Sequence, residues 1–145
     1  MLNNDGITHI NIYSKGKTEL GRFLSNFTHY PFITEDGKFD SVEGYWYWLL
    51  SNSPEKDVLK TLHGYKAKET GRKLCKNEWY DEEIFKSKIK TAILIKINSE
   101  DCYKSFIKNE LPFDHYYVYG DKIVRPKEAQ WIIDFFNEIR LKNAK

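Results

Sequence analysis

Short segments rich in β-branched and aromatic residues alternate with polar turn signals along the chain, and they predict strands. In the first segment, residues 7–13, Ile10 and Ile12 fall on one face. The pair Asp36-Gly37 is a tight-turn signal and predicts a hairpin between two further strands. We expect strands at 7–13, at 30–33, at 38–39, at the end of 111–120, and at 123–124. Residues 14–20 are polar, and with the glycine-led stretch 21–27 they predict a loop.

Apolar residues at spacings of three and four predict helices between these strands. The clearest helix begins at the acidic run 81–83, which suits a helix N-terminus. Its inward stripe consists of Phe85, Ile89, Ala92, Ile93 and Lys96. Other expected helices begin near Asp40-Ser41, Ser53-Pro54, Tyr65, Ser99 and Pro126. The last of these carries the apolar face Trp131, Ile132, Phe135, Phe136 and Ile139.

The order of the elements favours a mainly α fold with a small β-sheet (α+β). Alternating βαβ units are absent, so a doubly wound parallel sheet is not expected. A chain of 145 residues without a linker or a repeat predicts one compact domain, 1–145. No apolar run reaches the ~20 residues of a membrane span, and no secretion signal opens the chain. We therefore expect a cytoplasmic protein with no membrane contact.

The net charge of +2 is unevenly distributed. Acids outnumber bases in residues 1–58, whereas Lys and Arg dominate residues 59–108. This basic band is either the solvated side of several helices or an attraction for phosphates, and charge patterning leaves both interpretations open. The two cysteines, Cys75 and Cys102, lack the spacing of metal ligands. We expect no metal, no cofactor and no disulfide.

The candidate chemistry centres on Glu43, which stands at a predicted helix start and is followed by four aromatic residues at 45–48. A carboxylate beside aromatic faces suits a flat nucleobase joined to a reactive sugar carbon. The structural alternative is a capping box, because Glu43 lies three residues after Asp40.

Four separated motifs together carry a family resemblance. They are Gly21-x-Phe23-Leu24-Ser25-Asn26-Phe27, Phe39-x-Ser41-Val42-Glu43, Ala67-x-x-x-Gly71-Arg72 and Trp79. In this order and spacing the chain resembles the NADAR (YbiA-like) family over nearly its whole length. The segment 111–120 and the helix around Trp131 are also similar to one branch of that family.

The resemblance implies a compact, mainly helical fold and cleavage of N-glycosidic bonds. Two substrate classes are associated with the family: ADP-ribose on guanine in nucleic acid, the product of DarT-type toxins, and phosphorylated riboflavin-pathway ribosyl intermediates. The implied catalytic residues are Glu43, Trp79 and Asp114, with Asp121 as a competing candidate for the C-terminal acid.

The implied roles follow the chemistry of N-glycoside cleavage, in which positive charge develops on the sugar. We expect Glu43 to act ionised, as base or electrostatic stabiliser, without a strongly raised pKa. Trp79 would stack on the base or the ribose. The ligand-binding candidates are Ser25 and Asn26 at ribose hydroxyls, Arg72 at a phosphate, and Phe27, Tyr47 and Asp121.

Each candidate also has a structural alternative. Trp79 would serve as a core aromatic residue, Arg72 as a surface partner of Glu69, and Asn26 as support for its own loop. Asp114 and Asp121 both adjoin a strand end and suit turns. The chain departs from the family at Gly44, Tyr47, Trp48 and Leu50, where members commonly carry His, Gln and Lys.

The sequence therefore predicts an N-glycosidase that removes ADP-ribose from guanine in DNA. One rival is hydrolysis of riboflavin-pathway intermediates. Another is a module that binds ADP-ribose or an NAD-derived nucleotide, an ADP-ribose-like small molecule, without turnover.

Overall fold

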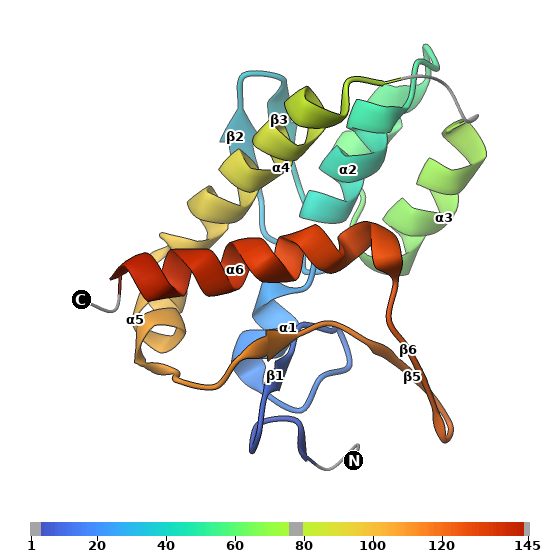
Figure 1. The fold of residues 1–145 in the computed structure, drawn as a ribbon. Coiled ribbons are helices and arrows are strands. Elements are labelled where there is room, and N and C mark those ends of the chain that lie inside the picture. The colour runs from blue at the N-terminus through green and yellow to red at the C-terminus, as the bar shows by residue number, and fades with distance from the viewer. Residues whose placement is uncertain (1–3, 76–79, 144–145) are drawn as a thin grey trace. The chain divides into compact units, whose positions relative to one another are not determined.

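The computed structural model describes residues 4–75 and 80–143 of the chain (Figure 1). Helices dominate, and the strands form three separate two-stranded sheets among the described residues. The predicted class, mainly α with small β structure, is confirmed. Contacts divide the chain into two compact units, Met1–Ser25 with Ile97–Lys145 (unit 1) and Asn26–Lys96 (unit 2). The prediction of one domain stays a prediction, and each unit is described by itself.

Unit 1 is built from both ends of the chain. Its elements are β1 (Ile10–Asn11), α1 (Glu19–Leu24), α5 (Glu100–Lys108), β4 (Phe113–Asp114), β5 (Tyr117–Tyr119), β6 (Lys122–Val124), the 3-10 helix η3 (Lys127–Ala129) and α6 (Gln130–Asn143). Strand β1 pairs in parallel with β4, in the register Ile10 to Phe113. The rings of Phe106, Phe113 and Phe136 pack together in its core, with a stacked pair 5.2 Å apart between the first two.

The helix α1 corrects the prediction of a loop at this position. Thr18 caps it by accepting a hydrogen bond from the Gly21 amide at 2.9 Å. A Cβ on Gly21 would lie 2.3 Å from the Asn11 carbonyl oxygen, so the helix packs directly on the strand backbone. Six residues form a helix here because of that tertiary contact, which local propensity does not report. Only two residues of the expected strand 7–13 pair as a strand, and its first residues, Ile7 and Thr8, lie in a turn in which both amides donate to the Asn4 carbonyl.

Unit 2 holds the hairpin and the helices of the middle of the chain. Its elements are β2 (Phe32–Thr34), β3 (Gly37–Phe39), α2 (Val42–Leu50), the 3-10 helix η2 (Lys56–Thr61), α3 (Gly64–Leu74) and α4 (Glu82–Ile97) up to Lys96. The hairpin is antiparallel, and Gly37 at its turn has φ +119°, which favours glycine. The helix expected after Ser53-Pro54 is instead the 3-10 helix η2, because Ser53 first closes a turn by accepting from the Glu55 amide.

The inward stripe predicted for α4 is confirmed, because all five of its residues are buried, Lys96 included. A polar network fixes the hairpin turn to two helices of unit 2. The Tyr45 hydroxyl and the Lys88 ammonium both donate to Asp36 Oδ2, at 2.7 and 2.8 Å. In the described parts of the chain, every helix falls short of the length and hydrophobicity that a bilayer crossing requires.

Candidate active site

The start of helix α2 places Glu43, and its cap decides between two interpretations of that residue. Ser41 is the N-cap: its Oγ accepts from the Gly44 amide at 3.0 Å and donates to the Leu62 carbonyl at 2.9 Å. Glu43 is therefore the second residue of the helix, one position short of the capping-box acid. The capping-box interpretation is wrong, since the cap is Ser41 and not Asp40.

The Glu43 side chain is buried, with 9% of its surface exposed. Among the described residues no hydrogen bond reaches its carboxyl group, and burial raises its pKa to about 7 against the opposing charges of Lys68 and Arg72. We expected Glu43 to act with a pKa near its ordinary value, and here the structure differs. Because the pKa lies near neutrality, protonated and ionised forms of Glu43 coexist at pH 7.

The loop that carries Asn26 and Phe27 is tied to this helix start. The Glu43 amide donates to the Asn26 carbonyl at 2.9 Å, and the Gly64 amide donates to the Phe27 carbonyl at 3.0 Å. The Lys68 ammonium lies 5.9 Å from the centre of the Phe27 ring. These main-chain bonds hold the loop beside the starts of α2 and α3, so Asn26 and Phe27 are neighbours of Glu43 within unit 2.

Tyr47, from α2 itself, and Arg72, from the facing helix α3, complete the group. Tyr47 packs on Gly71 so closely that an added Cβ would lie 2.2 Å from the Tyr47 Cγ. Burial and the Glu43 charge raise the pKa of Tyr47, while Arg72, its hydrogen-bond partner, lowers it. Glu69 pairs instead with Lys66 at 3.7 Å, and no Arg72–Glu69 ion pair occurs among the described residues. Arg72 thus faces the Glu43 group.

The remaining predicted residues lie elsewhere. Trp79 falls outside the described residues. Ser25 is buried in unit 1 as the C-cap of α1, and its amide donates to the Arg22 carbonyl at 3.3 Å. Asp121 is exposed in the turn between β5 and β6.

Asp114 is engaged by its own neighbours in unit 1. Arg125 binds both of its carboxylate oxygens, at 2.8 and 3.3 Å, and the His115 amide donates to Oδ1 at 2.7 Å. Burial raises the pKa of Asp114, but the hydrogen bonds from Arg125 and His115 outweigh it and leave the pKa below its usual range. Asp114 is an ion-paired carboxylate rather than a proton donor.

Sequence reasoning overlooked Lys68. The charges of Lys68 and Arg72 both lower the pKa of Glu43. The signal was present: Lys68 and Arg72 are four residues apart and so share one side of a helix. Both belong to the basic band of the sequence, part of which therefore surrounds a buried acid.

The Glu43 group of unit 2 (Asn26, Phe27, Glu43, Tyr47, Lys68 and Arg72) combines a carboxyl poised near neutrality, two cations and two aromatic rings. Such a carboxyl is suited to exchange a proton or to balance a developing positive charge. The cations suit an anionic ligand. Within the described ranges, no three His, Cys, Asp or Glu side chains cluster closely enough to hold a metal ion.

The chain matches no protein-family profile, no curated protein and no solved structure. The likeness to the NADAR family therefore rests on the short sequence motifs alone.

Proposed function

We propose that the chain is an N-glycosidase that removes ADP-ribose from guanine in DNA. The observation that carries the proposal is the buried Glu43 carboxyl, with a pKa of about 7, next to Lys68 and Arg72. An acid kept near neutrality by burial is typical of general acid–base catalysis, and structural acids at helix starts do not need it. The motif resemblance supplies the bond type.

In the proposed reaction, the bond between the ribose C1″ and the guanine nitrogen breaks and its electron pair stays with the base. Water adds to the sugar carbon, which carries positive charge as the bond opens. Ionised Glu43 stabilises that charge and accepts the proton of the attacking water, and a proton returns to the leaving nitrogen. The products are DNA with an unmodified guanine and free ADP-ribose.

The cations and the loop have complementary tasks. Arg72 offers a planar fork that suits the diphosphate, and Lys68 adds a second positive charge. The Tyr47 hydroxyl donates or accepts a hydrogen bond at the edge of the Glu43 group, and the Asn26–Phe27 loop borders the sugar. Trp79 is proposed to stack on the base. Ser25, Asp114 and Asp121 belong to unit 1, and their part in ligand binding stays a prediction.

The test is incubation of the purified chain with DNA that carries ADP-ribosylated guanine, followed by mass analysis of the DNA and of released ADP-ribose. We expect wild-type protein to restore the unmodified mass. Glu43→Gln should lower the rate by about 100-fold or more, because general acid–base catalysis contributes that much. Glu55→Gln, at an exposed position of the same unit, is the matched control and should retain the wild-type rate.

Three outcomes contradict the proposal. A wild-type rate in Glu43→Gln would assign Glu43 a structural role only. Turnover of phosphorylated riboflavin-pathway ribosyl compounds, with none on modified DNA, would favour the small-molecule rival. Tight binding of ADP-ribose, without its release from modified DNA or from the small-molecule compounds, would favour a binding module.

A further inference from the structure

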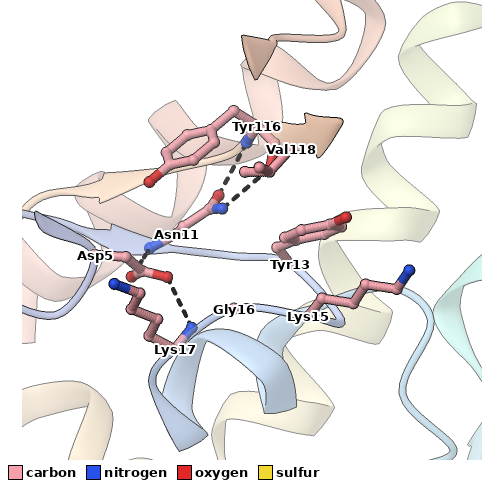
Figure 2. A pocket seen from close by; sticks show the side chains of 8 residues that line it. All are labelled: Asp5, Asn11, Tyr13, Lys15, Gly16, Lys17, Tyr116 and Val118. Carbon is pink, nitrogen blue, oxygen red and sulfur yellow. Dashed lines mark hydrogen bonds between the residues drawn. The ribbon is translucent and has the colours of Figure 1, made fainter. Parts of the chain in front are cut away.

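A cavity of about 270 Å³ lies in unit 1, and none of the residues that line it belongs to the Glu43 group (Figure 2). Its lining residues are Asp5, Asn11, Tyr13, Lys15, Gly16, Lys17, Tyr116 and Val118. They come from the segment before β1, from β1 and the loop after it, and from the segment around β5. Nothing in the proposed reaction uses them.

The floor of the cavity is engaged in holding unit 1 together. Asp5 accepts hydrogen bonds from the Asn11 and Lys17 amides at 2.9 and 2.8 Å. The Asn11 amide group pairs with both backbone groups of Tyr116, at 2.9 and 3.0 Å. An anionic ligand group is therefore unfavourable next to Asp5. The polar groups of Asp5 and Asn11 are already hydrogen-bonded within the protein, so they are poorly placed to recognise one nucleobase over another.

The other side of the cavity has the opposite character. In Figure 2 the side chains of Tyr13 and Lys15 extend in the same direction, away from Asp5. Lys15 is exposed and belongs to no ion pair among the described residues. A ligand with one flat apolar ring and one phosphate fits this polarity, with the ring against Tyr13 and the phosphate at Lys15.

Tyr13 also joins the cavity to a row of aromatic rings. Its ring centre lies 5.6 Å from that of Tyr117, which in turn lies 6.3 Å from that of Tyr119. Side chains two residues apart on a strand share a face, so Tyr117 and Tyr119 point to the same side of β5. The Tyr119 side chain is 61% exposed and has open space for a stacked base.

The hairpin adds a second cation to this row. In the antiparallel pairing of β5 with β6, Tyr119 is directly opposite Lys122, and directly opposite residues share a face. Gly120 at the tip has φ +62°, which allows the two-residue turn that sets this register. Lys122 is exposed and forms no ion pair within the described ranges. Figure 1 shows the hairpin extending away from the helices of its own unit.

We propose that this face of unit 1 (Tyr13, Lys15, Tyr117, Tyr119 and Lys122) binds single-stranded DNA. Successive bases stack on the tyrosine rings, and backbone phosphates pair with the two lysines that flank the row. Aromatic rings interleaved with cations are the usual construction of sequence-tolerant single-strand sites. The choice of DNA over RNA rests on the proposed function, whose substrate is modified DNA.

The test measures binding of the full chain to an unmodified, labelled oligothymidylate of about twelve nucleotides by fluorescence anisotropy. We expect a dissociation constant on the order of 10⁻⁴ to 10⁻⁶ M that rises steeply with salt. Tyr119→Ala should weaken binding by roughly tenfold, and Tyr119→Trp should retain it, because stacking needs a ring rather than a hydroxyl. Tyr103→Ala, an exposed tyrosine of α5, is the matched control and should bind as the wild type does.

The lysines are tested through the salt dependence. Lys15→Gln and Lys122→Gln should each reduce the slope of log affinity against log salt by about 0.7, the value for one phosphate contact on a single strand. Lys104→Gln, an exposed lysine of α5, should leave the slope unchanged. An oligomer of abasic sugars should bind at least tenfold more weakly than oligothymidylate if bases stack.

The proposal is overturned if abasic and base-carrying strands bind equally, if Tyr119→Ala binds as the wild type does, or if the matching RNA binds tenfold more tightly than DNA. The assay uses unmodified DNA and needs no turnover. Release of ADP-ribose from a modified mononucleotide tests the proposed reaction separately. Failure of the strand site and failure of the glycosidase reaction are thus distinguishable.

Discussion

At the scale of single residues, the burial of the Glu43 carboxyl carries a cost to stability. An acid with a pKa of about 7 resists ionisation because burial removes its carboxylate from water. Neighbouring Lys68 and Arg72 offset only part of that penalty. Catalytic groups are commonly held in such unfavourable surroundings, whereas a purely structural acid at a helix start is more stable when exposed.

This penalty predicts how the stability of the protein depends on pH. Folding raises the pKa of Glu43 from 4.5 to about 7, so between these values the folded protein holds a proton that the unfolded chain has released. The contribution of Glu43 to the free energy of unfolding is therefore fully present below about pH 4.5. It falls as the pH rises and is lost above about pH 7, a change of about 3 kcal/mol.

Glu43→Gln removes this titration. Relative to the wild type, the variant should gain about 3 kcal/mol more in free energy of unfolding at pH 8 than at pH 4.5. Urea unfolding at the two pH values measures the difference, and Glu55→Gln is the exposed control. An equal effect of Glu43→Gln at both pH values would show that the carboxyl titrates at its ordinary pKa.

At the scale of elements, sequence patterns identified what depends on local periodicity. The stripe from Phe85 to Lys96 is buried as expected, and the expected hairpin is present, although it turns at Glu35-Asp36, one residue before the predicted Asp36-Gly37. The helix α1 escaped prediction because it forms against the backbone of Asn11, and periodicity does not contain such a tertiary contact. The 3-10 form of η2 escaped prediction because it follows a local turn in which Ser53 accepts from the Glu55 amide.

Sequence patterns predicted only part of the candidate site, because they identify residues but not how those residues pack. The motifs brought Asn26, Phe27, Glu43, Tyr47 and Arg72 into consideration, and unit 2 gathers all five. The side chains of Glu43, Tyr47 and Arg72 come together because α2 and α3 pack closely at Gly71, whereas the Asn26–Phe27 loop is held by its backbone carbonyls. The burial that sets the pKa of Glu43 comes from this packing, which no residue pattern states.

The close packing of α2 on α3 yields a prediction for Gly71. In Gly71→Ala the new Cβ would lie 2.2 Å from the Tyr47 Cγ, so the helices must separate or Tyr47 must move. Overpacking of this kind costs about 1–3 kcal/mol, more than the ~0.5–1 kcal/mol by which alanine favours a helix. Thermal or urea unfolding measures the net loss. Lys73→Ala, exposed on the same helix, should be neutral or slightly stabilising.

At the scale of the whole molecule, the topology makes unit 1 dependent on both ends of the chain. The segment 1–25 supplies β1 and α1, and the segment 97–145 supplies the partners of both. Contacts between these segments close a loop that contains the whole of unit 2 in sequence. Loop-closure entropy grows only slowly with length, so a few well-made contacts suffice to hold the ends together.

Asn11 makes the contacts on which this closure depends, and its removal gives the last prediction. Asn11 is 1% exposed, and its side chain binds the amide and the carbonyl of Tyr116, a residue that is itself 3% exposed. Asn11→Ala leaves two buried backbone groups of Tyr116 without partners, at about 1–3 kcal/mol each. We expect a loss of about 2–4 kcal/mol in urea unfolding, with exposed Asn52→Ala as the control. Asn11→Asp keeps the acceptor for the Tyr116 amide, but it buries a carboxylate that faces the Tyr116 carbonyl oxygen near Asp5, so its loss at neutral pH should be at least as large as that of Asn11→Ala. If Asn11→Ala unfolds at the wild-type urea concentration, the two ends are held by other contacts, and the side chain of Asn11 contributes only the shape of the cavity floor.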